Sequence, residues 1–206
     1  MATIYDLKPR FQNLLRPLVQ KLARKGVTAN QVTIAAAILS ALTGGIVLFL
    51  PIRHWSLLLV PIVLFVRMAL NAIDGMLARE HAMQSHLGAI LNELGDVLSD
   101  AALYLPLAVI DGLPGWLVII VVVLAICIEM NGVVAVQIGA SRRYDGPFGK
   151  SDRAFLFGLL SLLLGVGLSP GWWSNALLAI MLVLAILTMR NRSIRALREV
   201  ADDAAK

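Results

Sequence analysis

Long apolar stretches separated by short polar breaks dominate the pattern of this sequence. An α-helix needs about 20 predominantly apolar residues to cross a lipid bilayer. Stretches close to this length occur at residues 31–51, 55–79, 85–110, 115–140, 153–169 and 173–190. Pro, Gly or Asp residues separate them, at Pro51, Asp111–Gly115, Gly146–Gly149 and Pro170–Gly171. The pattern predicts an all-α polytopic membrane protein with six transmembrane helices.

The first 30 residues follow a different pattern. Leucine and phenylalanine recur at helical spacing between Leu7 and Leu22. The basic residues of this segment are Lys8, Arg10, Arg16, Lys21, Arg24 and Lys25. This combination is typical of an amphipathic helix that lies on an anionic membrane surface, although a solvated basic helix would share it. Pro17 predicts that the helix is kinked or divided in two.

Composition and charge agree with a membrane protein and orient it. Of the 206 residues 59% are hydrophobic and 15% are charged, and the mean hydropathy is +0.81. A soluble domain of this size could not cover so much apolar surface. Six helices place both termini on one side, together with every Lys and Arg of the connecting loops except Arg53. Both termini are therefore expected to be cytoplasmic.

These features predict one domain, 1–206, with an interfacial segment (1–30), a six-helix bundle (31–190) and a cytoplasmic tail (191–206). The net charge of +5 then belongs to the membrane surface, and no nucleic-acid partner is expected.

Polar and ionisable residues interrupt the apolar pattern between positions 71 and 100. Ionisable groups at membrane depth are costly, so they are candidates for function. Asn71 and Asp74 share one face of the second predicted helix. A stripe on the third repeats every four residues, at Gly88, Asn92, Asp96 and Asp100. The short connection between the two helices predicts antiparallel neighbours whose polar stripes face each other.

This set of side chains favours a site for a cation and a phosphate. Two carboxylates with two amide oxygens suit Mg²⁺, Mn²⁺ or Ca²⁺. Arg79 adds a guanidinium fork suited to phosphate, and Gly75 and Gly88 permit close approach of a backbone or a ligand. At the cytoplasmic membrane interface, a lipid headgroup could meet a soluble phosphorylated compound. The alternative is a polar network that only holds helices together.

The same residues resemble, with every spacing intact, the D-x2-D-G-x2-A-R-x8-G-x3-D-x3-D motif of the CDP-alcohol phosphatidyltransferases. The matching residues are Asn71, Asp74, Gly75, Ala78, Arg79, Gly88, Asn92 and Asp96. "TANQVT", from Thr28 to Thr33, is similar to the T-P-N-x-x-T segment that precedes the first membrane helix of the family, with Ala29 in place of the usual proline. The resemblance is to a bacterial branch with Asn at the first and third aspartate positions.

The resemblance implies an enzyme of phospholipid biosynthesis in the bacterial inner membrane, with its active site at the cytoplasmic interface. It would transfer a phosphatidyl group from CDP-diacylglycerol to a polar alcohol, phosphorylated or not, and release CMP. Asp96 would be the general base. The implied ligands of Mg²⁺ or Mn²⁺ are Asn71, Asp74, Asn92 and Asp96, and the implied donor-binding residues are Gly75, Ala78, Arg79 and Gly88. The family also implies a homodimer.

The two asparagines depart from the family, in which four acids bind two divalent cations. An amide oxygen can ligate a cation but brings no charge, so two formal negative charges are absent at Asn71 and Asn92. The site is expected either to hold one cation firmly or to hold two weakly. Asp100, one turn after Asp96, is a further candidate ligand that would restore charge.

A second basic patch lies between the fourth and fifth predicted helices, from Ser141 to Phe155. Its "GPFGK" sequence predicts a turn that places Lys150 near a phosphate. In the family, basic residues of this region help to bind the acceptor, which makes Arg142, Lys150 and Arg153 candidates for an acceptor phosphate. The alternative is a positive-inside loop without a ligand. Glu129 is expected to be an interior polar contact.

Two functions of other classes stay open. The missing acids would suit a non-catalytic membrane protein that binds lipid or nucleotide. The acids Asp74, Asp96, Asp100 and Glu129 would suit an ion or solute carrier, but carriers commonly contain inverted repeats, and this sequence has no internal repeat. Within the transferase interpretation the acceptor is open, with glycerol phosphate, inositol phosphate, serine and a sugar all compatible.

Overall fold

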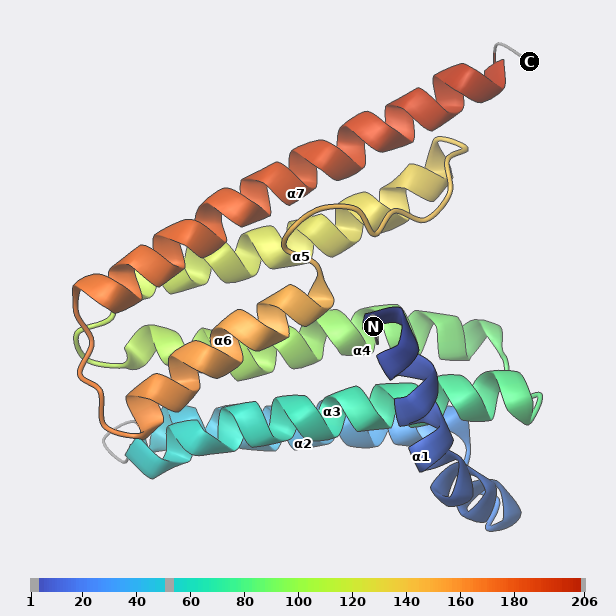
Figure 1. Cartoon of the computed structure of the whole chain (residues 1–206), viewed down its shortest axis with the longest axis horizontal. Helices are drawn as coiled ribbons and strands as arrows, with labels where there is room; N and C mark the ends of the chain where they lie inside the picture. Colours follow the sequence, from blue (N-terminus) through green and yellow to red (C-terminus); the bar gives the residue numbers. More distant parts are fainter. Residues whose placement is uncertain (1–3, 51–53, 205–206) are drawn as a thin grey trace. The chain divides into compact units, whose positions relative to one another are not determined.

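The computed structural model describes residues 4–50 and 54–204, with side chains from residue 9 onward. All secondary structure in these residues is helical (Figure 1), which confirms the all-α prediction. The elements are α1 (Ile4–Arg24), α2 (Ala29–Phe49), α3 (His54–Glu80), α4 (His86–Tyr104), the 3₁₀ helix η1 (Leu105–Val109), α5 (Gly115–Gln137), α6 (Lys150–Gly165) and α7 (Trp172–Ala204). Pro51 and Arg53, used above for a helix break and for orientation, lie outside the described residues.

Each predicted membrane helix corresponds to one observed α-helix, but several ends differ. The stretch 85–110 is not one helix: α4 ends at Tyr104 and η1 follows, with Pro106 near its start, where a backbone N–H is missing. The expected end at 190 is wrong because α7 continues to Ala204. The apolar stretch stops near residue 190, but the Arg, Ala and Glu residues that follow it still favour a helix. At the other terminus, Pro17 does not divide α1.

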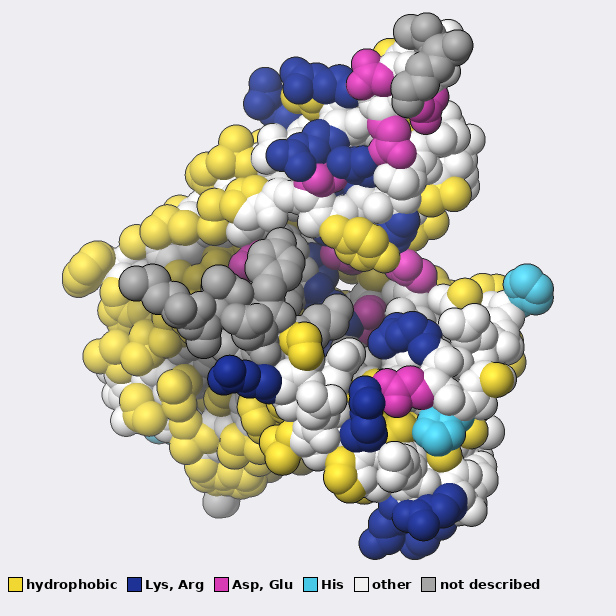
Figure 2. Space-filling view, turned by 45° about the vertical axis from the view of Figure 1, so that its right-hand side comes forward, with side chains coloured by type: hydrophobic (Ala, Val, Ile, Leu, Met, Phe, Trp, Pro, Cys, Tyr) yellow, Lys and Arg dark blue, Asp and Glu magenta, His cyan; other side chains and the backbone are white. Residues whose placement is uncertain are grey.

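Four helices in the described ranges, α2, α3, α5 and α7, are long and apolar enough to cross a membrane. Helix α4 carries three acids, and α6 has only 16 residues. Large apolar side chains are exposed on the four helices, for example Leu42, Phe65 and Val183, which are 64%, 62% and 55% exposed. Apolar side chains cover much of the face seen in Figure 2. Such a surface suits lipid rather than water.

The chain forms two compact units, and the first runs from α1 to Leu42 and from Ile62 to Ser99. Its apolar core joins three helices and consists of Val19, Ala29, Val32, Ile73, Met76 and Leu77. An ion pair of 3.1 Å between Arg16 and Glu80 also joins α1 to the end of α3. One face of α1 is thus packed against protein, whereas Leu14 on another face is 76% exposed.

The second unit contains Thr43–Pro61 and the chain from Asp100 onward. Helices α5 and α7 run side by side in it (Figure 1). The rings of Tyr104 and Phe157 stack with their centroids 4.0 Å apart. A glycine at position 44 is required because a Cβ there would overlap the carbonyl oxygen of Ala102. These contacts fix the frame on which the basic residues of the second unit are held.

Candidate active site

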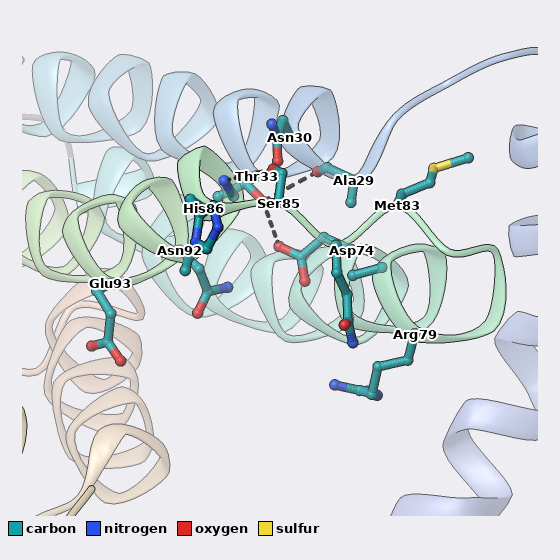
Figure 3. A pocket seen from close by; sticks show the side chains of 15 residues that line it. Ala29, Asn30, Thr33, Asp74, Arg79, Met83, Ser85, His86, Asn92 and Glu93 are labelled. Carbon is teal, nitrogen blue, oxygen red and sulfur yellow. Dashed lines mark hydrogen bonds between the residues drawn. The ribbon is translucent and has the colours of Figure 1, made fainter. Parts of the chain in front are cut away.

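A pocket of about 680 Å³ opens in the first unit, between the start of α2, the end of α3 and the start of α4 (Figure 3). Six of the eight motif positions line it: Asp74, Gly75, Ala78, Arg79, Gly88 and Asn92. Two residues of the "TANQVT" segment, Asn30 and Thr33, line it as well. Residues up to 64 positions apart in the chain, from Ala29 to Glu93, are thereby gathered around one cavity.

The "TANQVT" segment forms the N-terminus of α2, which brings its polar residues to the pocket. The hydroxyl of Thr28 accepts a hydrogen bond of 3.2 Å from the N–H of Gln31, and the Gln31 side chain accepts one of 3.0 Å from the N–H of Thr28. This reciprocal pair is a capping box. The alanine at 29 occupies the first helical position, where proline is also favoured, so the departure from the family leaves the helix start intact.

The Asp74 carboxylate is held by this helix start. Asp74 is only 4% exposed, and its Oδ2 accepts a hydrogen bond of 2.8 Å from the hydroxyl of Thr33. The hydroxyl also lies 3.2 Å from the carbonyl oxygen of Ala29. In Figure 3 the Asp74 carboxylate points toward Thr33, while the Glu93 carboxylate points away from it. A fixed, buried carboxylate is a suitable anchor for a hard cation.

The two motif glycines leave room for polar groups at the pocket wall. A Cβ at Gly75 would lie 3.0 Å from Nη2 of Arg79, so the guanidinium folds back over this glycine. A Cβ at Gly88 would lie 2.8 Å from Oδ1 of Asn30 and 3.0 Å from Oγ of Ser85. Any larger residue would displace these groups. Arg79 is itself exposed, so its fork stays accessible to a phosphate.

The other two motif positions, Asn71 and Asp96, contact each other. Nδ2 of Asn71 donates a hydrogen bond of 3.4 Å to Oδ1 of Asp96, which joins α3 to α4. As predicted, these helices are neighbours and their polar stripes meet. In the part of the chain that the structure describes, no group of three or more His, Cys, Asp or Glu side chains could hold a metal. A cation here would rely on two carboxylates assisted by amide oxygens.

Arg67 belongs to the same cluster but is not among the residues predicted from the sequence. It lies one helical turn before Asn71 on α3 and is 3% exposed. Its Nη2 lies 4.0 Å from Oδ1 of Asp96. The signal in the sequence was a lone charged residue in the middle of an apolar helix, which the cost of burying a charge marks as functional or paired. Arg67 precedes the motif, so the motif spacing does not include it.

The predicted acceptor-binding arginines lie in the second unit, where they converge on Glu129. Nη1 of Arg153 lies 2.9 Å and Nη2 of Arg142 lies 3.1 Å from the Glu129 carboxylate, and Nη1 of Arg192 lies 3.5 Å from it. Arg153 also donates to Asp100, at 3.2 Å from Nη2. Arg153, Arg192 and Asp100 are 2%, 1% and 6% exposed. As predicted, Glu129 is an interior polar contact.

The loop between α5 and α6 is held in place by charged contacts. Arg143 and Arg195 donate hydrogen bonds of 2.7 and 2.6 Å to the two carboxylate oxygens of Asp145. Burial would raise the pKa of Asp145, but these hydrogen bonds outweigh it and lower the pKa below its ordinary value. The chain bends at residues 146–148 of the "GPFGK" sequence, and Gly146 has φ of +114°. Lys150 follows as the first residue of α6 and is half-buried.

Comparison with known proteins agrees with the motif. Residues 26–191 match the model of the CDP-alcohol phosphatidyltransferase family, so the chain belongs to this family. It is 50% identical over 192 residues to the inner membrane protein YnbA of Escherichia coli (strain K12), covering 92% of this chain and 94% of that protein. An uncharacterized protein of Aquifex aeolicus (strain VF5) is 33% identical over 103 residues, half of each chain.

The fold is also similar to that of solved structures. The phosphatidylinositol phosphate synthase PgsA1 of Mycobacterium tuberculosis, crystallised with manganese and citrate, has a TM-score of 0.73 to this chain, with 87% of each chain covered. Its crystal structure with CDP-DAG bound has a TM-score of 0.70, with 89% of this chain and 92% of that chain covered. Sequence identity is 22% in both comparisons, so they establish a shared fold.

Proposed function

We propose that this protein transfers a phosphatidyl group from CDP-diacylglycerol to a polar alcohol and releases CMP. The observation that carries the proposal is the gathering of six motif positions around one pocket at Asp74. Membership of the CDP-alcohol phosphatidyltransferase family supports it. So does the fold shared with PgsA1, whose crystal structures include one with CDP-DAG bound.

The pocket offers groups suited to the diphosphate of the donor. The Arg79 guanidinium folds over Gly75 and is accessible, which suits bidentate contact with phosphate oxygens. Gly75, Ala78 and Gly88 would let the diphosphate approach the backbone of α3 and α4 closely. The small side chains at these positions would leave open the space that the diphosphate needs.

Mg²⁺ or Mn²⁺ is the proposed cofactor. The chemistry of the donor set fits such an ion, because oxygen atoms of Asp74, Asp96, Asn71 and Asn92 are hard ligands. When bound, the ion would neutralise charge on the diphosphate and on the leaving group. Manganese is present in one PgsA1 crystal structure, which supports a divalent cation in the present protein. Asp100 is a weaker candidate as a ligand because it accepts hydrogen bonds from Arg153.

The chain's own residues would then carry the transfer. Asp96 would take the proton of the acceptor hydroxyl, and the acceptor oxygen would attack the phosphorus attached to diacylglycerol. The bond from that phosphorus to the oxygen of CMP would break as the new phosphodiester forms. The hydrogen bond from Asn71 would orient Asp96 for this step. Arg79 would hold the departing CMP phosphate.

Arg142, Lys150 and Arg153 are the proposed acceptor-binding residues. A phosphate on the acceptor would have to share Arg142 and Arg153 with Glu129, since both already form ion pairs with it. Lys150, the first residue of α6, is half-buried and would supply a third positive charge to this phosphate.

We further propose a multi-pass bacterial inner membrane protein, like the Escherichia coli relative named for that membrane. Helices α2 to α7 would form six spans, of which α4 and α6 are the two less apolar ones. Helix α1 would lie at the cytoplasmic interface, both termini would be cytoplasmic, and the active site would open on that side. A homodimer is proposed by analogy with the family.

The decisive experiment mixes purified protein with CDP-diacylglycerol, Mg²⁺ or Mn²⁺ and separate polar alcohols. Release of CMP and a new phospholipid in the mass spectrum would establish the activity and name the acceptor. Binding of CDP-diacylglycerol with no CMP released for any alcohol would support the non-catalytic alternative, which the two asparagines in the motif favour. Of the four acids that the carrier interpretation would use, Asp100 and Glu129 form ion pairs with Arg153, which favours a structural role for these two.

A further inference from the structure

The Asp96 carboxylate is contacted on one oxygen atom by two groups of α3. Nδ2 of Asn71 lies 3.4 Å from Oδ1 of Asp96, and Nη2 of Arg67 lies 4.0 Å from the same atom. Arg67 and Asn71 are four residues apart, so they lie on one face of the helix. Both face the same carboxylate from this position, one as a hydrogen-bond donor and the other as a positive charge.

We propose that Arg67 and Asn71 together take the place of one divalent cation at Asp96, so that this protein binds a single cation, beside Asp74. The inference rests on the proposed function and concerns how that site holds its charge. It gives Arg67 the role of a positioning residue, because it acts on the donor and acceptor through Asp96.

The first argument is the short distance between positions 71 and 96. An aspartate in place of Asn71 would bring a second carboxylate to about the same 3.4 Å separation. Two carboxylates this close repel each other strongly unless a cation lies between them. The amide removes the repulsion and donates a hydrogen bond instead. Asn71 is therefore suited to an Asp96 that has no metal ion on this oxygen.

The second argument is burial. The side chain of Arg67 is 4% exposed and that of Asp96 is 27% exposed. A guanidinium so far from water needs a negative partner, because an uncompensated buried charge is strongly destabilising. The Asp96 carboxylate, 4.0 Å from Nη2, supplies a negative charge to it. A divalent cation bound to the same oxygen would repel the guanidinium in a place where water screens poorly.

The third argument is the balance of charge. Four aspartates at the motif positions would carry four negative charges and balance two divalent cations. In this protein Asp74 and Asp96 carry two negative charges, and Arg67 adds one positive charge. One divalent cation would leave a single positive charge in excess, which the donor diphosphate can neutralise. A second divalent cation would leave three positive charges in excess, and the ligands would carry too little negative charge to hold it.

The positions of the other two proposed ligands, Asp74 and Asn92, agree with the binding of a single cation. Asp74 and Asn92 line the pocket, whereas Asn71 and Asp96 are not among its lining residues. The cation would therefore sit on the pocket side, with Asp74 as its anchor.

The test counts Mn²⁺ ions bound to the purified full-length protein in detergent, by electron paramagnetic resonance of free Mn²⁺ during a titration. We expect one Mn²⁺ per chain for the wild type and two for Arg67→Gln combined with Asn71→Asp. Arg67→Lys should keep one. Arg16→Gln is the matched control, because it removes an arginine of the same unit that pairs with Glu80, and it should also keep one.

Two Mn²⁺ ions in the wild type, or none, would overturn the proposal, and so would one in a folded double variant. If the double variant does not fold, the single variant Arg67→Gln decides: it should tighten Mn²⁺ binding about ten-fold, the effect of removing one nearby positive charge, and unchanged affinity would refute the proposal. The count needs no turnover, so a protein that binds one Mn²⁺ but releases no CMP would contradict only the proposed function.

Discussion

The hydroxyl of Thr33 lies 2.8 Å from the Asp74 carboxylate, across 41 residues of sequence. This hydrogen bond ties the start of α2 to the motif on α3, so the two sequence signatures of the family meet at one side chain. Asp74 is almost fully buried. The hydrogen bond from Thr33 therefore helps to set the direction in which the carboxylate faces the pocket.

The first prediction follows from this contact. Thr33→Val keeps the shape of the side chain but removes the hydroxyl, and we expect the Mn²⁺ concentration for half-maximal activity to rise about ten-fold, in line with the loss of one hydrogen bond to a charged group. Thr33→Ser keeps a hydroxyl and should have the same Mn²⁺ requirement as the wild type. Ser40→Ala is the control, because its hydroxyl bonds only within α2, to Ala36. An unchanged cation requirement in Thr33→Val would show that Asp74 is oriented by other contacts.

The second prediction concerns the two remaining motif carboxylates. Asp74→Asn and Asp96→Asn should each lower turnover by at least about 100-fold, because each removes a charged ligand or the proposed base. Thermal unfolding should show that both variants remain folded. Asp111→Asn, an exposed carboxylate in the α4–α5 connection, is the matched control and should keep full activity. Substantial turnover in either motif variant would refute the site.

The third prediction separates the acceptor from the donor. Lys150→Ala should raise the acceptor KM about ten-fold and leave the donor KM within about two-fold, if the acceptor carries a phosphate that Lys150 contacts. Arg198→Ala removes an exposed positive charge of the same unit and should change neither constant. If Lys150→Ala raises both KM values equally, the loop acts through its general positive charge and not through a contact with the acceptor. If neither KM changes, the loop is a positive-inside loop without a ligand.

The fourth prediction is structural and concerns Arg153. Because Arg153 is buried and paired with Asp100 and Glu129, Arg153→Met should destabilise the protein by about 3–5 kcal/mol by removing a buried positive charge that both carboxylates share. Adding Glu129→Gln should recover part of the loss, so that the two changes are less than additive. Thermal unfolding in one detergent measures all variants. A neutral Arg153→Met would mean that the network contributes little to folding.

The fifth prediction tests topology. In a Cys127→Ser background, Ala2→Cys and Ala205→Cys should resist a membrane-impermeant thiol reagent in intact cells. Gly112→Cys, in the connection between η1 and α5, should react because six spans place it outside. All three positions should react after the membrane is opened. A terminus that reacts in intact cells would contradict an even number of spans.

Much of the fold could be predicted from the sequence because its determinants are local. Twenty apolar residues in a row allow few solutions in a bilayer other than a helix, and the all-α class and the six predicted helical segments follow from that. The spacing from Asn71 to Asp96 placed the motif on two adjacent helices. Hydropathy alone could not locate the end of α7, because it marks the end of the apolar stretch and not the end of the helix.

Only the tertiary structure decided which charges meet. Arg67 contacts Asp96 across 29 positions, and Glu129 meets Arg192 across 63. Such pairs depend on how each helix is rotated about its axis and packed on its neighbours, and no local period of the sequence encodes that rotation. Sequence spacing therefore identified the residues of the motif. Helix packing assigned Arg67 to Asp96, Thr33 to Asp74 and three arginines to Glu129, because a buried charge takes the partner that packing brings to it.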